Sequence, residues 1–352
     1  MRQIMMVGAL AILVGMVGAE VFGQTNTRPA RPTTGPATGP ATGPATTRAS
    51  AATRKTDRIA RPDRTDKVDK TEAAPEAEAK YKKVTPEEMA DELTEARSDA
   101  DEVAKVMKIT FKEIETDHYI VFTDWDPREY GFLKTNVEGA YGAITKQFNI
   151  PLKENIYYGK LPCYMFAKND TFVEYSAKIE HMHAGPGLLG YYSGTDSGRG
   201  HMVMPKPDDR FTGGNLNNAK QLWGYVLTHE LTHSFVARYI SNVHIPTWLN
   251  EGIAEVVAAS VFPKNVRDEA RMVALQTKSF APLFDNRAGF QKAEMYPVMR
   301  TMTETLILKD HKVFLKFFDD IKKGSSAEES LKANYKWTFD DLEKYWRRYV
   351  GQ

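Results

Sequence analysis

The stretch His229-Glu230-Leu231-Thr232-His233 predicts both a helix and a metal centre in the second half of the sequence. An α-helix completes a turn every 3.6 residues, so side chains four positions apart lie nearly one above the other. His229 and His233 can therefore reach one metal ion from a single helix face. Glu230 is rotated by about 100° from His229, which places it beside the ion, where a general base would accept a proton from metal-bound water. This spacing is typical of a helix that holds a catalytic zinc.

A third ligand for this ion is expected from the segment Pro246-Thr247-Trp248-Leu249-Asn250-Glu251-Gly252-Ile253-Ala254-Glu255. Two histidines leave a tetrahedral zinc one protein ligand short, with the fourth position kept open for water. Glu251 follows His233 by eighteen residues, which leaves room for the first helix to end, turn and begin a second. Pro246 suits that break or the first turn after it. Glu255 lies one turn beyond Glu251 on the same face, where its carboxylate can orient the ring of a ligand histidine.

The region from His229 to Glu255 resembles the gluzincin metallopeptidases, in which HExxH is followed by a ligand glutamate on the next helix. The motif Trp-Leu-Asn-Glu-Gly-Ile-Ala-Glu is similar to the corresponding motif of the peptidase MA-like family. The stretch from Tyr296 to Tyr349 is similar to the helical tail of the bacterial members, so the resemblance covers roughly residues 111–350.

This resemblance implies that His229, His233 and Glu251 bind Zn²⁺ and that Glu230 is the catalytic base. The metzincin pattern does not fit, because it needs a glycine and a histidine at the positions of Val236 and Tyr239.

An α+β, zincin-like fold is expected for residues 83–352, with a small mixed sheet at about 110–210 and a mainly helical part at about 215–350. The capping pattern at Thr85-Pro86 opens a helix to about Met107, and strands are expected over 111–125 and 155–166. Helices are expected over 138–148 and 171–179, and a hairpin at 190–204. Within that hairpin, Gly200–Pro205 is the candidate for an edge strand that pairs with substrate along the cleft; an ordinary hairpin is the alternative.

Hydrolysis of an amide also needs a group that stabilises the oxyanion on the attacked carbonyl. Gluzincins often use a tyrosine or histidine from the helices after the ligand glutamate, and Tyr296, at the start of an expected helix over 294–308, is our candidate. The alternative for Tyr296 is an amphipathic side chain packed at a helix end. Tyr191, Tyr192 and Tyr239 are further candidates.

The remaining histidines carry weaker patterns. His181 and His183 would lie on the same side of an extended segment and could bind a second metal, but Gly185-Pro186-Gly187 favours a solvated loop. His244 is expected in the loop between the two metal helices. His118, His201 and His311 have no supporting pattern.

The N-terminus predicts export. Met1-Arg2-Gln3 precedes an apolar run to about Gly18, a secretory signal over residues 1–23 that is too short for a confident membrane span. An uncleaved anchor is the alternative. The single cysteine, Cys163, excludes intrachain disulfides and a lipid anchor near the start; it falls in an expected strand, where a buried, inert thiol is favoured.

Residues 24–82 are expected to be a disordered linker. Three Gly-Pro-Ala-Thr repeats between Gly35 and Thr46 are followed by alternating charges, with almost no large apolar side chain. A flexible spacer is one interpretation. The other is contact with an anionic envelope surface, since basic residues outnumber acidic ones between Arg28 and Arg64. The net charge of the whole chain is only +1, which argues against a nucleic-acid binder.

The sequence therefore predicts an exported zinc metallopeptidase that hydrolyses peptide bonds in peptide or protein substrates, with endopeptidase activity favoured because no amine-binding motif is present. Two alternatives from other classes are a catalytically inactive metal-binding or partner-binding module at the cell envelope and a structural envelope component.

Overall fold

The structure is a computed structural model that describes residues 84–185, 187–195, 197–285 and 292–352. The expected export signal (1–23) and linker (24–82) lie outside the described residues. The chain divides into two units, and every described residue belongs to the first of them; the second, Phe22–Glu78, lies outside the described residues.

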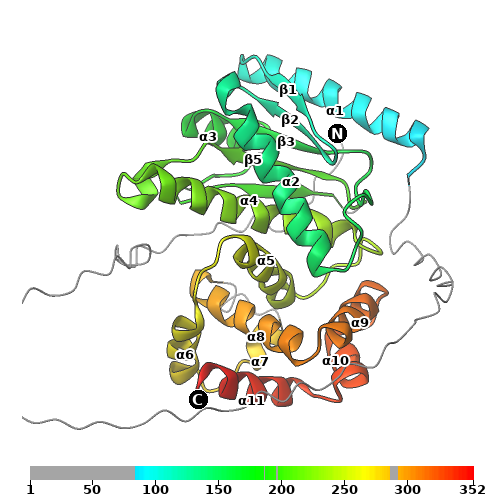
Figure 1. Cartoon of the computed structure of the whole chain (residues 1–352), viewed down its shortest axis with the longest axis vertical. Helices are drawn as coiled ribbons and strands as arrows, with labels where there is room; N and C mark the ends of the chain where they lie inside the picture. Colours follow the sequence, from blue (N-terminus) through cyan, green and yellow to red (C-terminus); the bar gives the residue numbers. More distant parts are fainter. Residues whose placement is uncertain (1–83, 186, 196, 286–291) are drawn as a thin grey trace, which may run out of the picture. The chain divides into compact units, whose positions relative to one another are not determined.

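The described residues form an α+β fold with a five-stranded mixed sheet and many helices (Figure 1). The strands are β1 (Lys112–Glu115), β2 (Tyr119–Thr123), β3 (Leu161–Phe166), β4 (Tyr191–Gly194) and β5 (Gly200–Pro205). The helices up to the metal motif are α1 (Pro86–Met107), α2 (Tyr130–Gln147), α3 (Asn169–Lys178) and α4 (Leu216–Arg238). The later helices are α5 (Thr247–Val261), α6 (Arg267–Gln276), α7 (Ala281–Phe284), α8 (Tyr296–Lys309), α9 (His311–Lys322), α10 (Ala327–Tyr335) and α11 (Phe339–Val350).

The sheet is covered by helices on both faces. Its strand order is β1-β2-β3-β5-β4, with β2, β3 and β5 parallel to one another and the two outer strands antiparallel to their neighbours. Successive side chains of a strand point to opposite faces. Ile120 and Phe122 therefore pack with α1 and α3, whereas Tyr119 and Val121 pack with α2 and α4. One face of the sheet thus supports the helix that carries the metal motif.

Several expected elements are confirmed. Thr85 caps α1 and forms a capping box with Glu88. The expected strand region 111–125 is the antiparallel pair β1–β2, and the hairpin is β4–β5. From Leu216 onward the described chain is almost entirely helical. Cys163 is fully buried in β3, and burial raises the pKa of its thiol, in keeping with an inert cysteine.

Two expected boundaries are wrong. The strand expected from residue 155 begins at Leu161, because Asn155 instead forms a turn: its side chain accepts a hydrogen bond from the Tyr157 N–H (2.9 Å), and Gly159 adopts a φ of 83°. The helix expected from residue 138 already begins at Tyr130. The glycines of its first part weaken the helical pattern in the sequence, but its apolar face is buried against the core and stabilises it.

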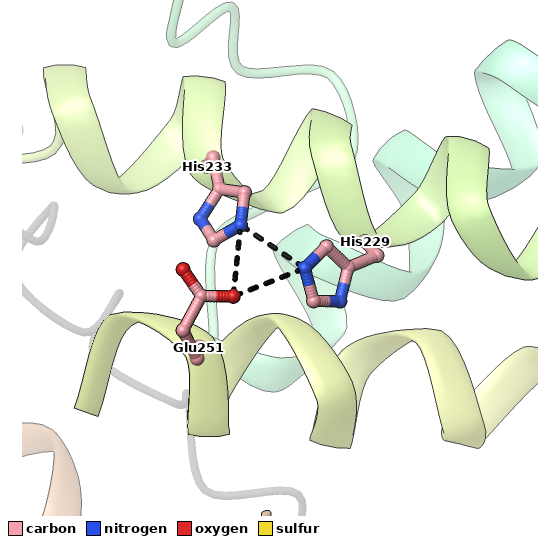
Figure 2. Close-up of side chains that lie close together, drawn as sticks. All are labelled: His229, His233 and Glu251. Atoms are coloured by element: carbon pink, nitrogen blue, oxygen red, sulfur yellow. Dashed lines mark hydrogen bonds and ion pairs between the residues drawn. The ribbon is translucent and has the colours of Figure 1, made fainter. Parts of the chain in front are cut away.

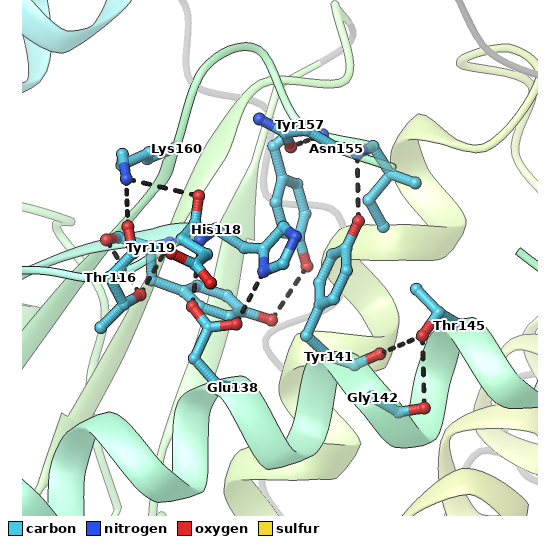
Figure 3. A network of polar contacts seen from close by, with 12 residues as sticks. Thr116, His118, Tyr119, Glu138, Tyr141, Gly142, Thr145, Asn155, Tyr157 and Lys160 are labelled. Carbon is cyan, nitrogen blue, oxygen red and sulfur yellow. Dashed lines mark hydrogen bonds and ion pairs between the residues drawn. The ribbon is translucent and has the colours of Figure 1, made fainter. Parts of the chain in front are cut away.

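A polar network joins the sheet to α2 (Figure 3) and reaches α4 at Ser234. The buried His118 ring contacts Glu138 on α2, with 2.6 Å between Nδ1 and the carboxylate. From the neighbouring Tyr119 a chain of hydroxyls continues through Tyr157 (3.4 Å) to Ser234 (3.0 Å), the residue after the second motif histidine. Buried polar groups that are all paired favour one arrangement of the elements they join. The network thereby fixes α4 against the sheet.

The helical part is built around α5, which packs between α4 and α8 (Figure 1). The last helix, α11, packs against α8 and α6 and buries Trp346. Within the described residues, no helix combines the length and apolar character that crossing a lipid bilayer requires.

Candidate metal centre

The helix α4 presents both motif histidines from its buried centre. Its first turn is capped by Asn215, whose side chain accepts hydrogen bonds from the N–H groups of Asn217 and Asn218. His229 and His233 are both buried, although histidine side chains in proteins are usually only partly buried. A buried imidazole needs partners for its nitrogens, and the carboxylates that face these two rings come from α5.

The helix α5 lies unusually close to α8 at Gly252. A Cβ atom at this position would lie 2.1 Å from Thr303 Oγ1 and 2.5 Å from the carbonyl oxygen of Met299, both on α8. Only glycine allows this approach, and the neighbouring Glu251 faces the histidines of α4 instead. The break before α5 is at Pro246, as expected, and α5 begins without a side-chain cap.

Three ligand atoms converge between α4 and α5 (Figure 2). His229 Nε2 lies 3.1 Å from His233 Nε2, and Glu251 Oε2 lies 3.3 and 3.5 Å from these two nitrogens. In the part of the chain that the structure describes, Glu251 Oε2 has no partner in ordinary hydrogen-bond geometry. A shared proton would account for the contact between the two nitrogens, whereas one cation accounts for all three contacts. The donor set therefore fits a metal ion, and His229, His233 and Glu251 can hold it.

Charge controls the protonation of this centre. Burial lowers the pKa of His229, but the contacts with Glu251 and Glu255 outweigh it and raise the pKa to about 10. Burial likewise opposes ionisation of Glu251, yet the two imidazoles hold its pKa at about 2. The carboxylates thus favour a proton on the imidazole pair, and an ion that binds must displace it.

Glu230 lies beside the three ligand atoms, and its charge acts on both histidines. Its Oε2 accepts a hydrogen bond of 3.1 Å from the Tyr192 N–H of β4. This contact orients the carboxylate and leaves Oε1 to receive a proton. Burial raises the pKa of Glu230 above its ordinary value, so that it is a stronger base than an exposed glutamate.

Glu255 contacts the far side of the His229 ring, as its spacing suggested, with 3.2 Å between His229 Nδ1 and Glu255 Oε1. Its other oxygen accepts a hydrogen bond of 2.5 Å from the hydroxyl of Tyr225. Arg300, on α8, is buried, and its positive charge acts on both Tyr225 and Glu255. Neither Tyr225 nor Arg300 was predicted as a site residue from the sequence. Their signal was present, because Tyr225 precedes His229 by one helical turn and Arg300 follows Tyr296 by one turn.

Tyr296 lies at the start of α8, with its ring centre 6.1 Å from that of His229. Its hydroxyl is buried and has no hydrogen-bond partner within the described residues. Burial, together with the charges of Glu251 and Glu230, raises its pKa far above the ordinary tyrosine value. The phenol therefore stays protonated and available as a hydrogen-bond donor.

The other candidate tyrosines point elsewhere. The hydroxyl of Tyr191 contacts Ser176 on the far face of the sheet, and that of Tyr239 donates to Asp319 on α9. The side chain of Tyr192 packs against Gly200, although its backbone N–H reaches the site.

The expected edge strand is wrong. Gly200–Pro205 (β5) lies inside the sheet, because it pairs on one side with β3 and on the other with β4. The edge strand is its hairpin partner β4, Tyr191–Gly194, which also packs against α4. Sequence alone shows that two strands form a hairpin but not which of them pairs with the rest of the sheet.

The remaining histidines form no second cluster of metal ligands among the described residues. His181, His183 and His244 are exposed, in keeping with the expected loops. His201 contacts the buried carboxylate of Glu180 at 2.6 Å, and His311 contacts the end of α2.

A scan against models of protein families finds no match to this chain, and neither does a search of curated proteins. Function is therefore inferred from the geometry and chemistry of the centre itself.

Proposed function

We propose that this chain is a gluzincin-type zinc peptidase with a zincin-like fold, in which His229, His233 and Glu251 bind Zn²⁺ and Glu230 is the catalytic base. The observation that carries the proposal is the triangle of donor atoms, completed by a carboxylate at the position of a base and a tyrosine hydroxyl without a partner.

The size of the triangle supports zinc. In a tetrahedral site with bonds of 2.0–2.1 Å, ligand atoms are about 3.3–3.4 Å apart. An octahedral site with bonds of the same length would hold them about 3.0 Å apart. The observed separations of 3.1, 3.3 and 3.5 Å agree better with the tetrahedral value. Two imidazoles and one carboxylate, with a fourth position left over, are also the ligands of a catalytic zinc.

The balance of buried charge supports a divalent ion. The carboxylates of Glu230, Glu251 and Glu255 are 1, 3 and 6 % exposed. The positive charge of Arg300 acts on Glu255 but is also paired with Glu304, so negative charge at the centre is left to be balanced. Buried charges without a counter-charge are costly, and neutral imidazoles with one divalent ion remove that cost.

The arrangement of side chains suits the hydrolysis of an amide. A bound zinc would supply a Lewis acid that polarises the attacked carbonyl and lowers the pKa of water. Glu230 accepts a proton from the attacking water as the new C–O bond forms. Tyr296 donates a hydrogen bond to the oxyanion that develops on the carbonyl oxygen. Glu230 then gives its proton to the amine as the C–N bond breaks.

The substrate class and the location of the enzyme are part of the same proposal. Peptides or proteins are the proposed substrates, and an extracytoplasmic compartment is proposed from the apolar run that follows Met1.

Replacing the base tests the mechanism separately from metal binding. Glu230→Gln keeps the size of the side chain and removes its ability to accept the proton, so we expect cleavage of labelled casein to fall by at least about 10²–10⁴-fold. The zinc content should not change, because Glu230 is not a ligand. Glu180→Gln, a buried glutamate on the far face of the sheet, should retain activity. Cleavage by Glu230→Gln at the rate of the wild type would contradict the mechanism.

A further inference from the structure

Three helices meet behind the metal centre in a common pattern. Each carries one residue at the centre and another residue one turn away: His229 and Tyr225 on α4, Glu251 and Glu255 on α5, and Tyr296 and Arg300 on α8. Residues four positions apart share a helix face. The residues behind the centre therefore form a second layer of contacts, which we call the Glu255 network: Tyr225, Glu255, Arg300 and Glu304.

The Glu255 network divides the oxygens of one carboxylate between two donors. Tyr225 donates to Glu255 Oε2 at 2.5 Å, and this leaves Oε1 to face His229 Nδ1 at 3.2 Å. If the Tyr225 hydroxyl were absent, Oε2 would be buried without a partner. A buried acceptor that loses its donor turns toward another one. His229 Nδ1 and Arg300 Nη1, which has no partner within the described residues, are buried donors at this place. The hydroxyl therefore fixes the rotation of the carboxylate.

Arg300 holds the other side of the network. Its Nε donates to Glu304 at 2.8 Å, which anchors the guanidinium one turn along α8. The guanidinium is buried, and its charge acts on both Tyr225 and Glu255. The helices α5 and α8, which carry Glu255 and Arg300, approach each other closely at Gly252, where a Cβ would meet Met299 and Thr303. A buried carboxylate is retained in its charged form only when such a counter-charge is present.

The second histidine has no equivalent support. Within the described residues, neither His229 Nδ1 nor His233 Nδ1 has a partner in ordinary hydrogen-bond geometry, but a carboxylate faces only the first of them, Glu255 at 3.2 Å from His229 Nδ1. The orientation of the imidazole pair is therefore set from the His229 side.

We propose that Tyr225 and Arg300 are positioning residues of the metal centre, which hold Glu255 as the acceptor that turns His229 Nε2 toward the ion. This proposal rests on the proposed function, because it assumes that the three ligands bind zinc. Neither residue touches the substrate or the ion, so their effect should be seen in metal binding itself.

The test is the zinc affinity of the full chain, measured by competition with a chromogenic chelator at one fixed pH. Loss of a group that orients a ligand histidine typically weakens metal binding by about 10–100-fold, and we expect this for Tyr225→Phe. Tyr191→Phe is the matched control, because it also removes a buried tyrosine hydroxyl with one hydrogen bond, to Ser176 on the far face of the sheet. Its zinc affinity should equal that of the wild type.

A second pair of variants keeps the test decisive if Tyr225→Phe does not fold. Arg300→Met removes the charge and should weaken zinc binding, whereas Arg300→Lys keeps the charge and should restore most of it. In ¹⁵N-labelled, zinc-loaded protein, the ring N–H of His229 should move in Tyr225→Phe and stay in place in Tyr191→Phe, a change that a general loss of stability would not produce.

The outcomes separate this proposal from the proposed function. Zinc affinity equal to the wild type in folded Tyr225→Phe, or in folded Arg300→Met, overturns the positioning role of that residue while leaving the metal centre intact. Failure of the wild-type chain to bind zinc overturns the proposed function, and this proposal with it, before any variant is compared.

Discussion

The proposed role of Tyr296 as a hydrogen-bond donor depends on its hydroxyl group. Its ring packs near His229, and its hydroxyl is buried without a partner in the described part of the chain. A buried hydroxyl without a hydrogen bond is costly, and at a functional site such an atom is explained by a ligand that pairs with it. The ring accounts for packing, and the hydroxyl, next to the charge of Glu251, is available to a bound substrate.

We predict that Tyr296→Phe lowers kcat without loss of zinc. Phenylalanine keeps the ring and removes the donor, and loss of one oxyanion donor typically costs about 10²–10³-fold in kcat. The measurement is steady-state cleavage of a quenched peptide, together with the metal content of the same samples. Tyr335→Phe, which removes a hydroxyl bonded to the carbonyl of Leu306 on α8, is the control. If Tyr296→Phe kept the full kcat, Tyr296 would be a packing residue alone.

At the scale of elements, the centre depends on how closely α5 approaches its neighbours. Glu251 reaches the histidines of α4 from one side of α5, while Gly252 lies against α8 on another. The sequence therefore places a ligand and a residue without a side chain next to each other. Glu251 contributes a ligand atom, and Gly252 allows α5 to lie close to α8.

Gly252→Ala should loosen the contact between α5 and α8. The added Cβ meets a backbone oxygen of Met299 as well as the Thr303 side chain, so the helices must separate. Overpacking of this kind costs about 1–3 kcal/mol, which unfolding in urea would measure, and zinc affinity should fall because Glu251 moves with α5. Gly139→Ala on α2 is the control: its Cβ meets nothing within 4 Å, so stability should stay the same or rise by up to about 1 kcal/mol. Equal stability of the two variants would show that the close approach is unimportant.

Elements differed in how well the sequence predicted them. The start of α1 followed from the capping residues Thr85 and Glu88, because a cap is a local interaction. The sequence could not show that β4 is the edge strand and that β5 lies inside the sheet. This order depends on which of the two strands pairs with β3, a contact between distant parts of the chain. The early start of α2 was missed for a related reason: burial against the core outweighs the weak helical propensity of its glycines.

At the scale of the whole described fold, the sheet and the helices make separate contributions to the centre. The helices supply the three ligand atoms, the network behind His229 and the Tyr296 hydroxyl. The sheet supplies the Tyr192 N–H that orients Glu230, and it anchors α4 through Tyr157 and Ser234. The proposed base is thus held by both parts.

The parts of the candidate site that were predicted come from residues close together in the sequence, and the parts that were missed come from distant residues. The convergence of His229, His233 and Glu251 was predicted from helical spacing and from one break between two helices. The contact of the Tyr192 N–H with Glu230 was not, since β4 lies far from Glu230 in the sequence and no short pattern describes how the strand packs against α4.

The most direct measurement is the metal content of the full chain after equilibration with zinc and removal of excess metal. The wild type should retain about one zinc per chain, with X-ray absorption showing nitrogen and oxygen ligands. Glu251→Ala should lose most of the ion, and Glu180→Gln should keep it. A wild-type chain without metal, or a zinc retained in full when both His229 and His233 are replaced by alanine, would contradict the account.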